Sequence, residues 1–369
     1  MDNRCLEEPE EIKQIDKADM LKFCLNMSRH YREAAKLATG ITTSYTKPSN
    51  IIITGMGGSA IGGELLKDWA RDKIQVPIEV NREYHLPAYA NEKTLVLVTS
   101  YTGDTEETLS ALLDAIQKRC MIYCITSGGT LRDIAERLNI PYLQVPAGMP
   151  PRAALPYMLM PLLVFLEKID VTEEVSREFE EALPIIETAE KQNAVEIPVK
   201  DSLAKTLAVN IKGLIPIVYG FGIYSSIARR FKQQINENAK MMSKWDNLPE
   251  LDHNEIVGYE KSEKHKERFV AIFIRDEDEP TEIRSRIEIT KKLIELSGVN
   301  IYEVWSQGKS SLAKMLSSIA VADFLSNYLA ILRGIDPTPV QTIDKLKESL
   351  KKNGVKEQVI KEIEKFSSA

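Results

Sequence analysis

Two short turns in this sequence combine glycine with hydroxyl side chains, and these residue types suit the binding of an anion. The first turn is residues 55–60, Gly-Met-Gly-Gly-Ser-Ala, and the second turn is residues 100–105, Ser-Tyr-Thr-Gly-Asp-Thr. Each follows an apolar run typical of a buried parallel strand and precedes an amphipathic helical pattern. Free backbone N–H groups and the positive end of a helix dipole meet at such a turn. Two of them in one sheet predict a pocket for a small phosphorylated ligand.

The hydroxyl groups of the two turns are the candidate phosphate ligands. Glycine before the first hydroxyl lets the backbone approach a ligand closely. We expect Ser59 to cap the helix that follows, a role that uses the same geometry as a phosphate contact. With Thr108 the second turn carries four hydroxyls within nine residues, which is more than a cap requires. The candidate binding residues are Gly57, Gly58, Ser59, Ser100, Thr102 and Thr105.

The first turn taken alone also fits a dinucleotide-binding fingerprint. Gly55, Gly57 and Ala60 have the required spacing, and Glu79 or Glu83 stands where an acidic ribose partner would follow. The second turn argues against this alternative, because a dinucleotide domain has no need of a second hydroxyl cluster. A P-loop motif does not occur, so the sequence disfavours nucleoside triphosphate chemistry.

The second half of the chain carries the candidate acid–base groups. Glu237 lies between Asn236 and Asn238, and two such mediocre helix formers around one carboxylate indicate a hydrogen-bonded site. The alternative for this segment is a solvated helical face. His253 is one of four histidines and suits proton transfer near neutral pH, although the sequence around it is also typical of a turn.

Alternating strand and helix patterns surround these residues and predict two doubly wound parallel sheets in tandem. In the first half we expect a helix over 16–40, strands at 51–54, 77–80, 95–99, 121–126 and 142–145, and helices at 59–72, 105–119, 129–137 and 154–168. In the second half we expect strands at 215–219, 269–275 and 300–305, and helices at 224–243, 281–297, 310–333, 340–351 and 355–366. The expected division is a phosphate-binding domain over 1–170, a helical connection over 171–200 and a second domain over 201–369.

Bulk properties exclude several classes of protein. The 369-residue chain has a net charge of −6 without a basic patch, which argues against nucleic-acid binding. The apolar stretch 153–166 is too short to span a bilayer, and the acidic N-terminus does not resemble a secretory signal. Four cysteines without metal-ligand spacing favour reduced thiols in a cytoplasmic protein over a zinc site.

The pair of turns resembles the sugar isomerase domain, in which a strand-end serine and a Ser-x-Ser-Gly-x-Thr loop hold a phosphate. Thr102 replaces a serine of that loop, and Asp104 replaces the commoner asparagine, so we expect Asp104 to point away from the anion as a helix cap. Over most of its length the chain resembles the bifunctional phosphoglucose/phosphomannose isomerase family. The matching segments are 55–59, 100–105, 151–152, 236–240, 250–254, 336–340 and 343–347.

The resemblance implies interconversion of glucose 6-phosphate and mannose 6-phosphate with fructose 6-phosphate through a cis-enediol, without cofactor or metal. By resemblance Glu237 is the base, and Arg152 stabilises the enediolate. His253 would assist ring opening from the partner subunit of a homodimer, with the site between domains. Lys345 would be a further ring-opening or phosphate contact, with Lys347 as the alternative. Thr338 would occupy the place of a larger glutamine and allow both C2 epimers.

Two other functions stay open at this point. One is a different phosphosugar isomerase, acting on a ketose or sedoheptulose phosphate. The other is a phosphosugar sensor without catalysis, but this alternative leaves Glu237 and His253 unexplained and has no DNA-binding helix through which to act.

Overall fold

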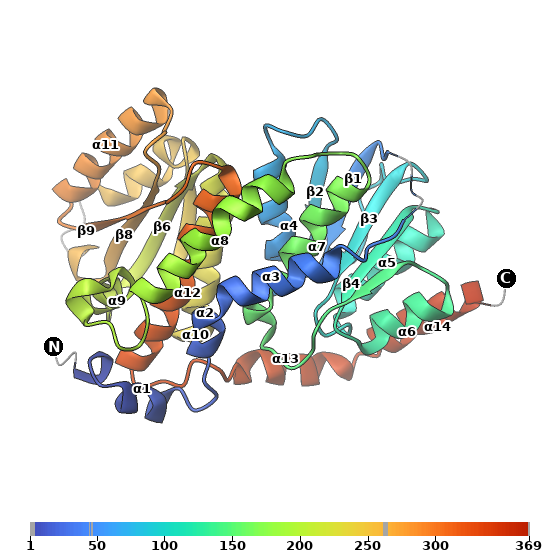
Figure 1. Ribbon diagram of the computed structural model, residues 1–369, viewed down its shortest axis with the longest axis horizontal. Helices are drawn as coiled ribbons and strands as arrows, with labels where there is room; N and C mark the ends of the chain where they lie inside the picture. Colours follow the sequence, from blue (N-terminus) through green and yellow to red (C-terminus); the bar gives the residue numbers. More distant parts are fainter. Residues whose placement is uncertain (1–3, 44, 46, 261–264, 368–369) are drawn as a thin grey trace. The chain divides into compact units, whose positions relative to one another are not determined.

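A computed structural model describes residues 4–43, 45, 47–260 and 265–367 of the chain. The chain forms two units, each with its own parallel sheet. Unit 1 comprises Met1–Ser28 and Glu178–Pro339, and unit 2 comprises Arg29–Arg177 and Val340–Ala369. Figure 1 labels the elements of both.

Unit 2 contains a five-stranded parallel sheet in the order β2-β1-β3-β4-β5. Its strands are β1 (Asn50–Thr54), β2 (Ile78–Asn81), β3 (Thr94–Thr99), β4 (Met121–Thr126) and β5 (Tyr142–Gln144). Its helices are α3 (Met27–Ala38), which begins two residues before the unit, α4 (Gly57–Ala70), α5 (Glu106–Gln117), α6 (Gly129–Arg137), α7 (Leu155–Lys168), α13 (Gln341–Lys351) and α14 (Val355–Glu364). This order is that of a doubly wound flavodoxin-like sheet, so the predicted fold class is confirmed.

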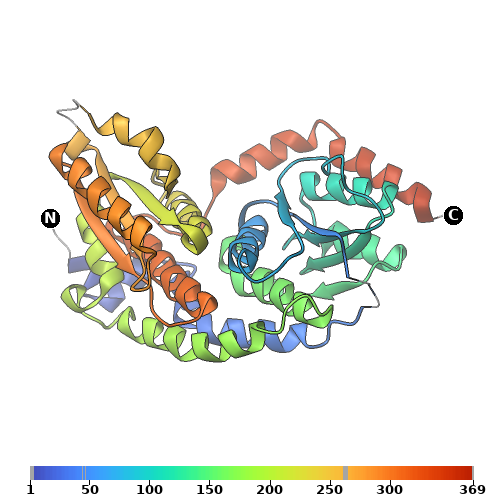
Figure 2. The same cartoon turned by 90° about the horizontal axis from the view of Figure 1, so that it is seen from above.

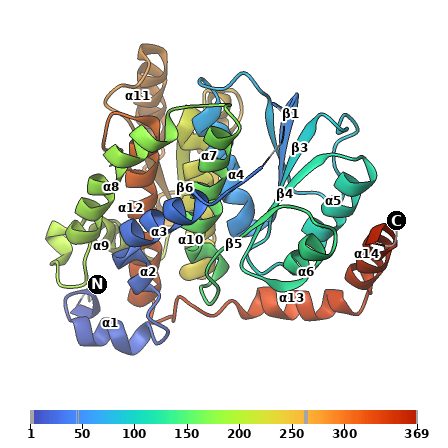
Figure 3. The same ribbon diagram turned by 45° about the vertical axis from the view of Figure 1, so that its right-hand side comes forward.

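Helices cover both faces of the unit 2 sheet, as the near-continuous apolar strands require. Figure 3 shows α4 and α7 on one side of β1, β3 and β4, and α5 and α6 on the other. On the first side the rings of Tyr123 and Phe165 are 4.6 Å apart. On the second side Val359 and Ile363 of α14 join the core formed by the strands and α5, and Figure 2 shows this red C-terminal helix beside the teal α5.

Unit 1 contains a four-stranded parallel sheet in the order β7-β6-β8-β9. Its strands are β6 (Ile215–Phe221), β7 (Lys244–Leu248), β8 (Phe269–Arg275) and β9 (Asn300–Trp305). Its helices are α1 (Pro9–Ile15), α2 (Leu21–Leu25), most of α8 (Val175–Gln192), α9 (Leu203–Ile211), α10 (Ser225–Asn238), α11 (Thr281–Leu296) and α12 (Ser311–Leu332). The four strands repeat the order β2-β1-β3-β4 of the other sheet, in agreement with the predicted tandem of parallel sheets.

Several elements differ from the sequence predictions. The helix expected over 16–40 is divided into α2 and α3, with Asn26 ending α2. Helix α10 ends at Asn238 rather than at 243, and the next residues lead to β7, a strand that the sequence analysis missed. Helix α4 begins at Gly57, two residues earlier than expected. The C-terminal helices α13 and α14 belong to unit 2, whereas the predicted division joined them to the second domain.

Helix α12 is long and apolar enough to cross a membrane by length and composition alone. However, 94% of its apolar window is buried inside the protein, which is the behaviour of a core helix. Even polar side chains of this helix, such as Asp323 and Ser326, are buried. Helix α12 is therefore surrounded by the rest of unit 1 and is its central helix.

Candidate active site

The first and second turns emerge side by side from the unit 2 sheet. They follow β1 and β3, which pair directly in parallel with Thr54 opposite Val98. The chain continues from β1 to β2 on one side and from β3 to β4 on the other, so the strand order reverses between β1 and β3. In an open α/β sheet the crevice at this reversal is where ligands bind. The two turns that the sequence singled out therefore flank the expected binding position.

Hydrogen bonds join the two turns. The backbone N–H of Tyr101 donates to Ser59 Oγ over 3.1 Å, and the Thr99 hydroxyl donates to the Thr54 carbonyl oxygen over 3.1 Å. A Cβ atom at Gly55 would lie 2.5 Å from Thr99 Oγ1, so only glycine fits there. Because α4 begins at Gly57, Ser59 lies inside the first turn of the helix. The expected capping role of Ser59 is wrong, and its buried hydroxyl instead accepts a bond from the second turn.

The second turn orders its own hydroxyl groups. The hydroxyls of Ser100 and Thr105 hydrogen-bond to each other over 3.0 Å, and the Gly103 N–H donates to Ser100 Oγ over 3.2 Å. Thr105 is the residue at the N-terminus of α5, and its side chain makes no capping bond to that helix. Thr102 is exposed. The hydroxyls thus lie at the positive ends of α4 and α5, an arrangement suited to a phosphate group.

Asp104 points away from the hydroxyls of the second turn, as expected, but it does not cap α5. Its Oδ1 atom accepts from the Thr130 hydroxyl over 2.7 Å and from Lys356 Nζ over 2.6 Å. Burial raises the pKa of this carboxyl, but the bonds from Lys356 and Thr130 outweigh burial and hold the pKa below its usual value. Lys356 on α14 therefore neutralises the one negative charge of the second turn.

Arg152 lies in the short 3-10 helix η2 (Pro151–Ala153), directly before α7, and only 3% of it is exposed. A Cβ atom at Gly58 would lie 2.7 Å from the Pro151 carbonyl oxygen and 3.3 Å from Arg152 Cα. Glycine in the first turn thus allows the backbone that carries Arg152 to approach it. The structure brings Arg152 together with the proposed phosphate residues in unit 2.

Glu237 is half-buried in the last turn of α10 in unit 1. One face of α10 is fixed to α12 at four-residue intervals. Asp323 accepts from Arg230 over 2.7 Å and from Gln234 over 2.8 Å, and the Asn238 amide donates to Ser326 Oγ over 2.9 Å. These bonds hold the end of the helix on which Glu237 stands.

Sequence reasoning missed these supporting residues, although a signal for them exists. Three polar residues four apart on a helix form one polar stripe, and Asp323 is a lone carboxylate within the apolar α12. Beside Glu237, the Asn236 Oδ1 atom is buried and makes no hydrogen bond within the described part of the chain. Buried acceptors are normally satisfied, so this atom fits a donor from a ligand.

Lys240 ties the segment of Thr338 to the end of α10. Its ammonium group donates to the carbonyl oxygens of Asn238 over 3.2 Å, Asp336 over 3.0 Å and Pro337 over 2.6 Å. The Thr338 N–H donates to Asp336 Oδ1 over 2.9 Å. Lys240 therefore holds Thr338 near the helix end that carries Glu237, a contact that the sequence did not predict.

His253 is exposed at the end of the 3-10 helix η5 (Glu250–His253) in unit 1. The residues on either side are anchored, since Asp252 accepts from Arg286 over 2.9 Å and from Thr290 over 2.7 Å on α11. Two residues further on, Glu255 accepts from the Tyr219 hydroxyl over 2.6 Å, and burial raises the pKa of Glu255. The backbone of His253 is thus fixed while its imidazole faces outward.

Lys345 and Lys347 both lie on α13 and are exposed, so the structure does not favour one over the other. Both belong to unit 2, with the proposed phosphate residues and Arg152. Glu237, His253 and Thr338 belong to unit 1.

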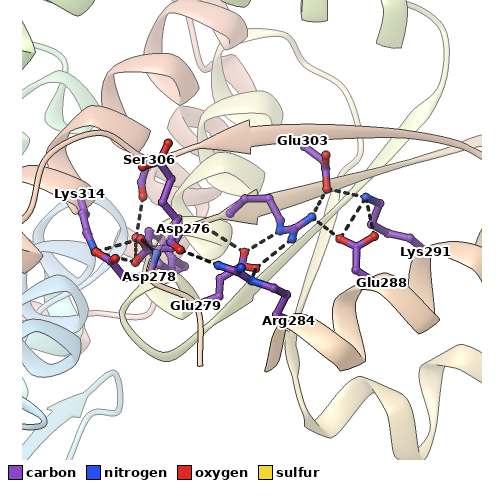
Figure 4. Close-up of polar contacts among 12 residues, drawn as sticks. Asp276, Asp278, Glu279, Arg284, Glu288, Lys291, Glu303, Ser306 and Lys314 are labelled. Atoms are coloured by element: carbon purple, nitrogen blue, oxygen red, sulfur yellow. Dashed lines mark hydrogen bonds and ion pairs between the residues drawn. The ribbon is translucent and has the colours of Figure 1, made fainter. Parts of the chain in front are cut away.

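The corresponding edge of the unit 1 sheet carries paired charges. Figure 4 shows carboxylates there together with lysine and arginine side chains and the Ser306 hydroxyl. Asp276 directly follows β8, accepts from the Tyr224 hydroxyl over 2.7 Å and pairs with Lys314 over 2.9 Å. Glu279 pairs with Arg275 over 2.6 Å. Internal ion pairs occupy this position in unit 1, whereas the proposed phosphate residues lie in unit 2.

The chain is similar to several known proteins. Residues 200–350 match a family model described as the bacterial phospho-glucose isomerase C-terminal SIS domain. A bifunctional phosphoglucose/phosphomannose isomerase of Caldicellulosiruptor bescii is 40% identical over 90% of this chain and 98% of its own length. The protein of the same name from Aquifex aeolicus is 36% identical over 85% of this chain and 94% of its own. The crystal structure of a hypothetical protein from Thermus thermophilus shares the fold, with a TM-score of 0.74, 16% identity and coverage of 95% and 94%.

Proposed function

Because the chain belongs to the bifunctional phosphoglucose/phosphomannose isomerase family, we propose that it interconverts glucose 6-phosphate and mannose 6-phosphate with fructose 6-phosphate. The observation that carries the proposal is the joined pair of turns between β1 and β3. Their hydroxyls and two helix N-termini form a cradle for one phosphate, with the buried Arg152 beside it. The substrate class is a phosphorylated hexose.

Proton transfer by Glu237 is the proposed chemical step. The carboxylate removes the proton from C2 of the open-chain aldose and returns it to C1. A second proton passes from the C2 hydroxyl to the C1 oxygen, so the C1 carbonyl becomes a hydroxyl and the C2 hydroxyl becomes the carbonyl, with a cis-enediol between them. The Arg152 guanidinium stabilises the negative oxygen that develops on this path. Asn236 Oδ1, buried next to the base, supplies an acceptor for a sugar hydroxyl.

Both aldoses give the same enediol because they differ only in configuration at C2. The proposed role of Thr338 is to leave room for rotation about C2–C3, so that either C2 proton reaches Glu237. The support is the bonding of Lys240, which holds the Thr338 segment to the end of α10. His253 and Lys345, with Lys347 as the alternative, are proposed to assist ring opening.

A homodimer in which His253 acts from the partner subunit is the proposed assembly. The exposed imidazole on an anchored backbone supports this role. Helix α11, to which Asp252 is bonded, also exposes three apolar side chains at helical spacing, Ile289, Leu293 and Leu296. Exposed apolar groups of this kind are common at protein interfaces.

A cytoplasmic location and independence of metal complete the proposal. The four cysteines are free thiols, which is typical of reducing compartments. The proposed reaction uses a protein base and needs no metal, so activity is expected to persist in a chelator such as EDTA.

The test measures the formation of fructose 6-phosphate from each aldose separately. The product is detected by its coupled reduction or by NMR. Both substrates are expected to react. Reaction of only one aldose contradicts the bifunctional assignment, and reaction of another ketose or heptulose phosphate in their place supports a different phosphosugar isomerase. Binding without turnover of any of them supports a sensor.

A further inference from the structure

Tyr101 occupies the second turn, and its polar groups reach three other segments of unit 2. Its N–H donates to Ser59 Oγ over 3.1 Å, and its carbonyl oxygen accepts from the Ser127 hydroxyl over 2.6 Å. Its side-chain hydroxyl donates to the Pro146 carbonyl oxygen over 2.9 Å and accepts from the Met149 N–H over 3.0 Å. Only 4% of the residue is exposed. The backbone bonds thus hold the second turn in place, while the hydroxyl bonds hold residues 146–149.

Residues 146–149 lead from β5 directly to Arg152. This segment has little means of ordering itself, because Pro146, Pro150 and Pro151 have no backbone N–H to donate. Gly148 adopts a φ of +92°, which glycine reaches readily, and glycine restricts the backbone less than any other residue. The two bonds from the Tyr101 hydroxyl therefore fix the chain shortly before Arg152.

The backbone of Arg152 is also constrained from the first turn. At Gly58 an added Cβ would lie 2.7 Å from the Pro151 carbonyl oxygen, so the backbones of the two segments are in direct contact. Arg152 thus follows a segment anchored by Tyr101 and packs against the turn that contains Ser59. Burial raises the pKa of Tyr101, so its hydroxyl keeps its proton and remains a donor at physiological pH.

We propose that the Tyr101 hydroxyl is a positioning group for Arg152, which sets the place of the guanidinium relative to the phosphate held by the two turns. This inference rests on the proposed function, in which Arg152 stabilises the enediolate. It separates two roles within one residue. The Tyr101 backbone helps to shape the phosphate cradle, and the Tyr101 hydroxyl affects the chemical step without contacting substrate.

The first test is Tyr101→Phe, which removes the hydroxyl and leaves the ring and backbone bonds. We expect kcat to fall about tenfold, because a displaced guanidinium stabilises the developing negative oxygen less well. The KM and the affinity for sorbitol 6-phosphate, a probe that cannot isomerise, should stay within about twofold. Tyr45→Phe is the matched control, since the Tyr45 hydroxyl likewise bridges a backbone carbonyl and N–H, both of Ile122. That variant should leave kcat unchanged.

The second test is a double-mutant cycle with Arg152→Met, which removes the guanidinium and keeps much of its apolar stem. If Tyr101 acts through Arg152, adding Tyr101→Phe to Arg152→Met causes no further loss of kcat. An equal tenfold loss in both backgrounds overturns the inference, as does an unchanged kcat in Tyr101→Phe or a loss confined to probe affinity. Failure of the proposed function is distinguishable, because the unmodified protein would then show no isomerisation of either aldose.

Discussion

The hydroxyl groups of the second turn differ in what they can still bind. Ser100 and Thr105 are bonded to each other, whereas Thr102 is exposed and accepts only a long 3.4 Å bond from the Asp104 N–H. Thr108 Oγ1 is buried and has no hydrogen-bond partner in the described ranges. At the scale of single residues, loss of the Thr102 hydroxyl should therefore weaken ligand binding more than it lowers the stability of the fold.

Replacement of Thr102 by valine tests its phosphate contact at nearly constant shape. We expect KM for both aldose phosphates to rise about 5–10-fold, because a hydrogen bond to a charged group is lost. The thermal unfolding midpoint should not change. Steady-state kinetics with each aldose measures the effect. Thr108→Val is the control, since it removes a buried hydroxyl of the same helix start. It should leave KM unchanged, and equal KM values in the two variants would contradict the role of Thr102.

The sequence predicted the position of the candidate site residues in the fold better than it predicted their hydrogen-bond partners. Its choice of hydroxyls agrees with their position between β1 and β3, because strand-turn-helix patterns place such residues at one sheet edge. The role of Ser59 as a cap was wrong, because the helix start depends on the φ of +52° at Gly57 rather than on the serine. The supports of Glu237 come from α12, some 90 residues away in sequence, and local patterns carry no such information.

At the scale of elements, two glycines of α4 determine how closely this helix approaches the segment of Arg152. Gly58 and Gly62 are four apart and share one helix face. A Cβ at Gly62 would lie 2.6 Å from the Met158 carbonyl oxygen of α7. The backbones of α4 and α7 are therefore in direct contact, and the position of the first turn depends on this contact.

Gly62→Ala is expected to lower the free energy of unfolding by about 1–3 kcal/mol, because the added methyl group must separate the two backbones. This loss should occur although alanine favours a helix more than glycine. Calorimetric unfolding measures it. At Gly57 a Cβ meets nothing within 4 Å, so Gly57→Ala tests backbone strain alone and should cost about 1 kcal/mol. A more stable Gly62→Ala protein would contradict the close packing.

Helix α14 is joined to the second turn by the ion pair of Lys356 and Asp104. The carboxyl pKa lies below its usual value, so the pair stabilises the fold at pH above about 3.9 and this stabilisation is lost as the pH falls through the lowered pKa. Lys356→Met should reduce the free energy of unfolding at pH 7 by no more than about 1 kcal/mol, since the pair is partly exposed.

The difference between Lys356→Met and the unmodified protein should therefore shrink as the pH falls below about 4. Denaturant unfolding at several pH values measures it. Lys361→Met, on the same helix, is the control and should show little change at any pH. A difference that grows on acidification would contradict the assigned pairing.

Strands and helices with strong apolar patterns were predicted well. A polar strand at a sheet edge and the end of a helix were not. Strand β7, Lys-Trp-Asp-Asn-Leu, lies at the edge of its sheet and lacks apolar alternation. The sequence from 239 to 243 continues a helical pattern, but Lys240 adopts a φ of +50° and α10 ends at Asn238. Tertiary bonds from Lys240 to Asp336 and Pro337 accompany this end.

At the scale of the whole molecule, the chain contains two copies of one sheet order with different chemistry at their carboxyl edges. The sequence predicted the tandem architecture from its alternating patterns. It could not predict that Val340–Ala369 joins unit 2, because an amphipathic helix does not specify which sheet it covers. Val359 and Ile363 settle this question by entering the core beside α5.

The proposed sharing of His253 between subunits predicts complementation. Glu237→Gln and His253→Asn should each be inactive alone. Mixed and refolded together, half of the dimers are hybrids with one intact site of two, so about a quarter of the full activity is expected. Activity of the mixture measured against each parent is the readout. No recovery despite hybrid formation would place His253 and Glu237 of one site in the same chain.

The most direct test of the central claim is the incubation of fructose 6-phosphate in heavy water with the protein and with Glu237→Gln. The account predicts that glucose 6-phosphate and mannose 6-phosphate both form and carry deuterium at C2, because one base exchanges its proton with solvent at the enediol. Glu237→Gln should bind the substrate without forming labelled product. Formation of only one aldose, or labelled products from Glu237→Gln at a near-normal rate, would contradict the account.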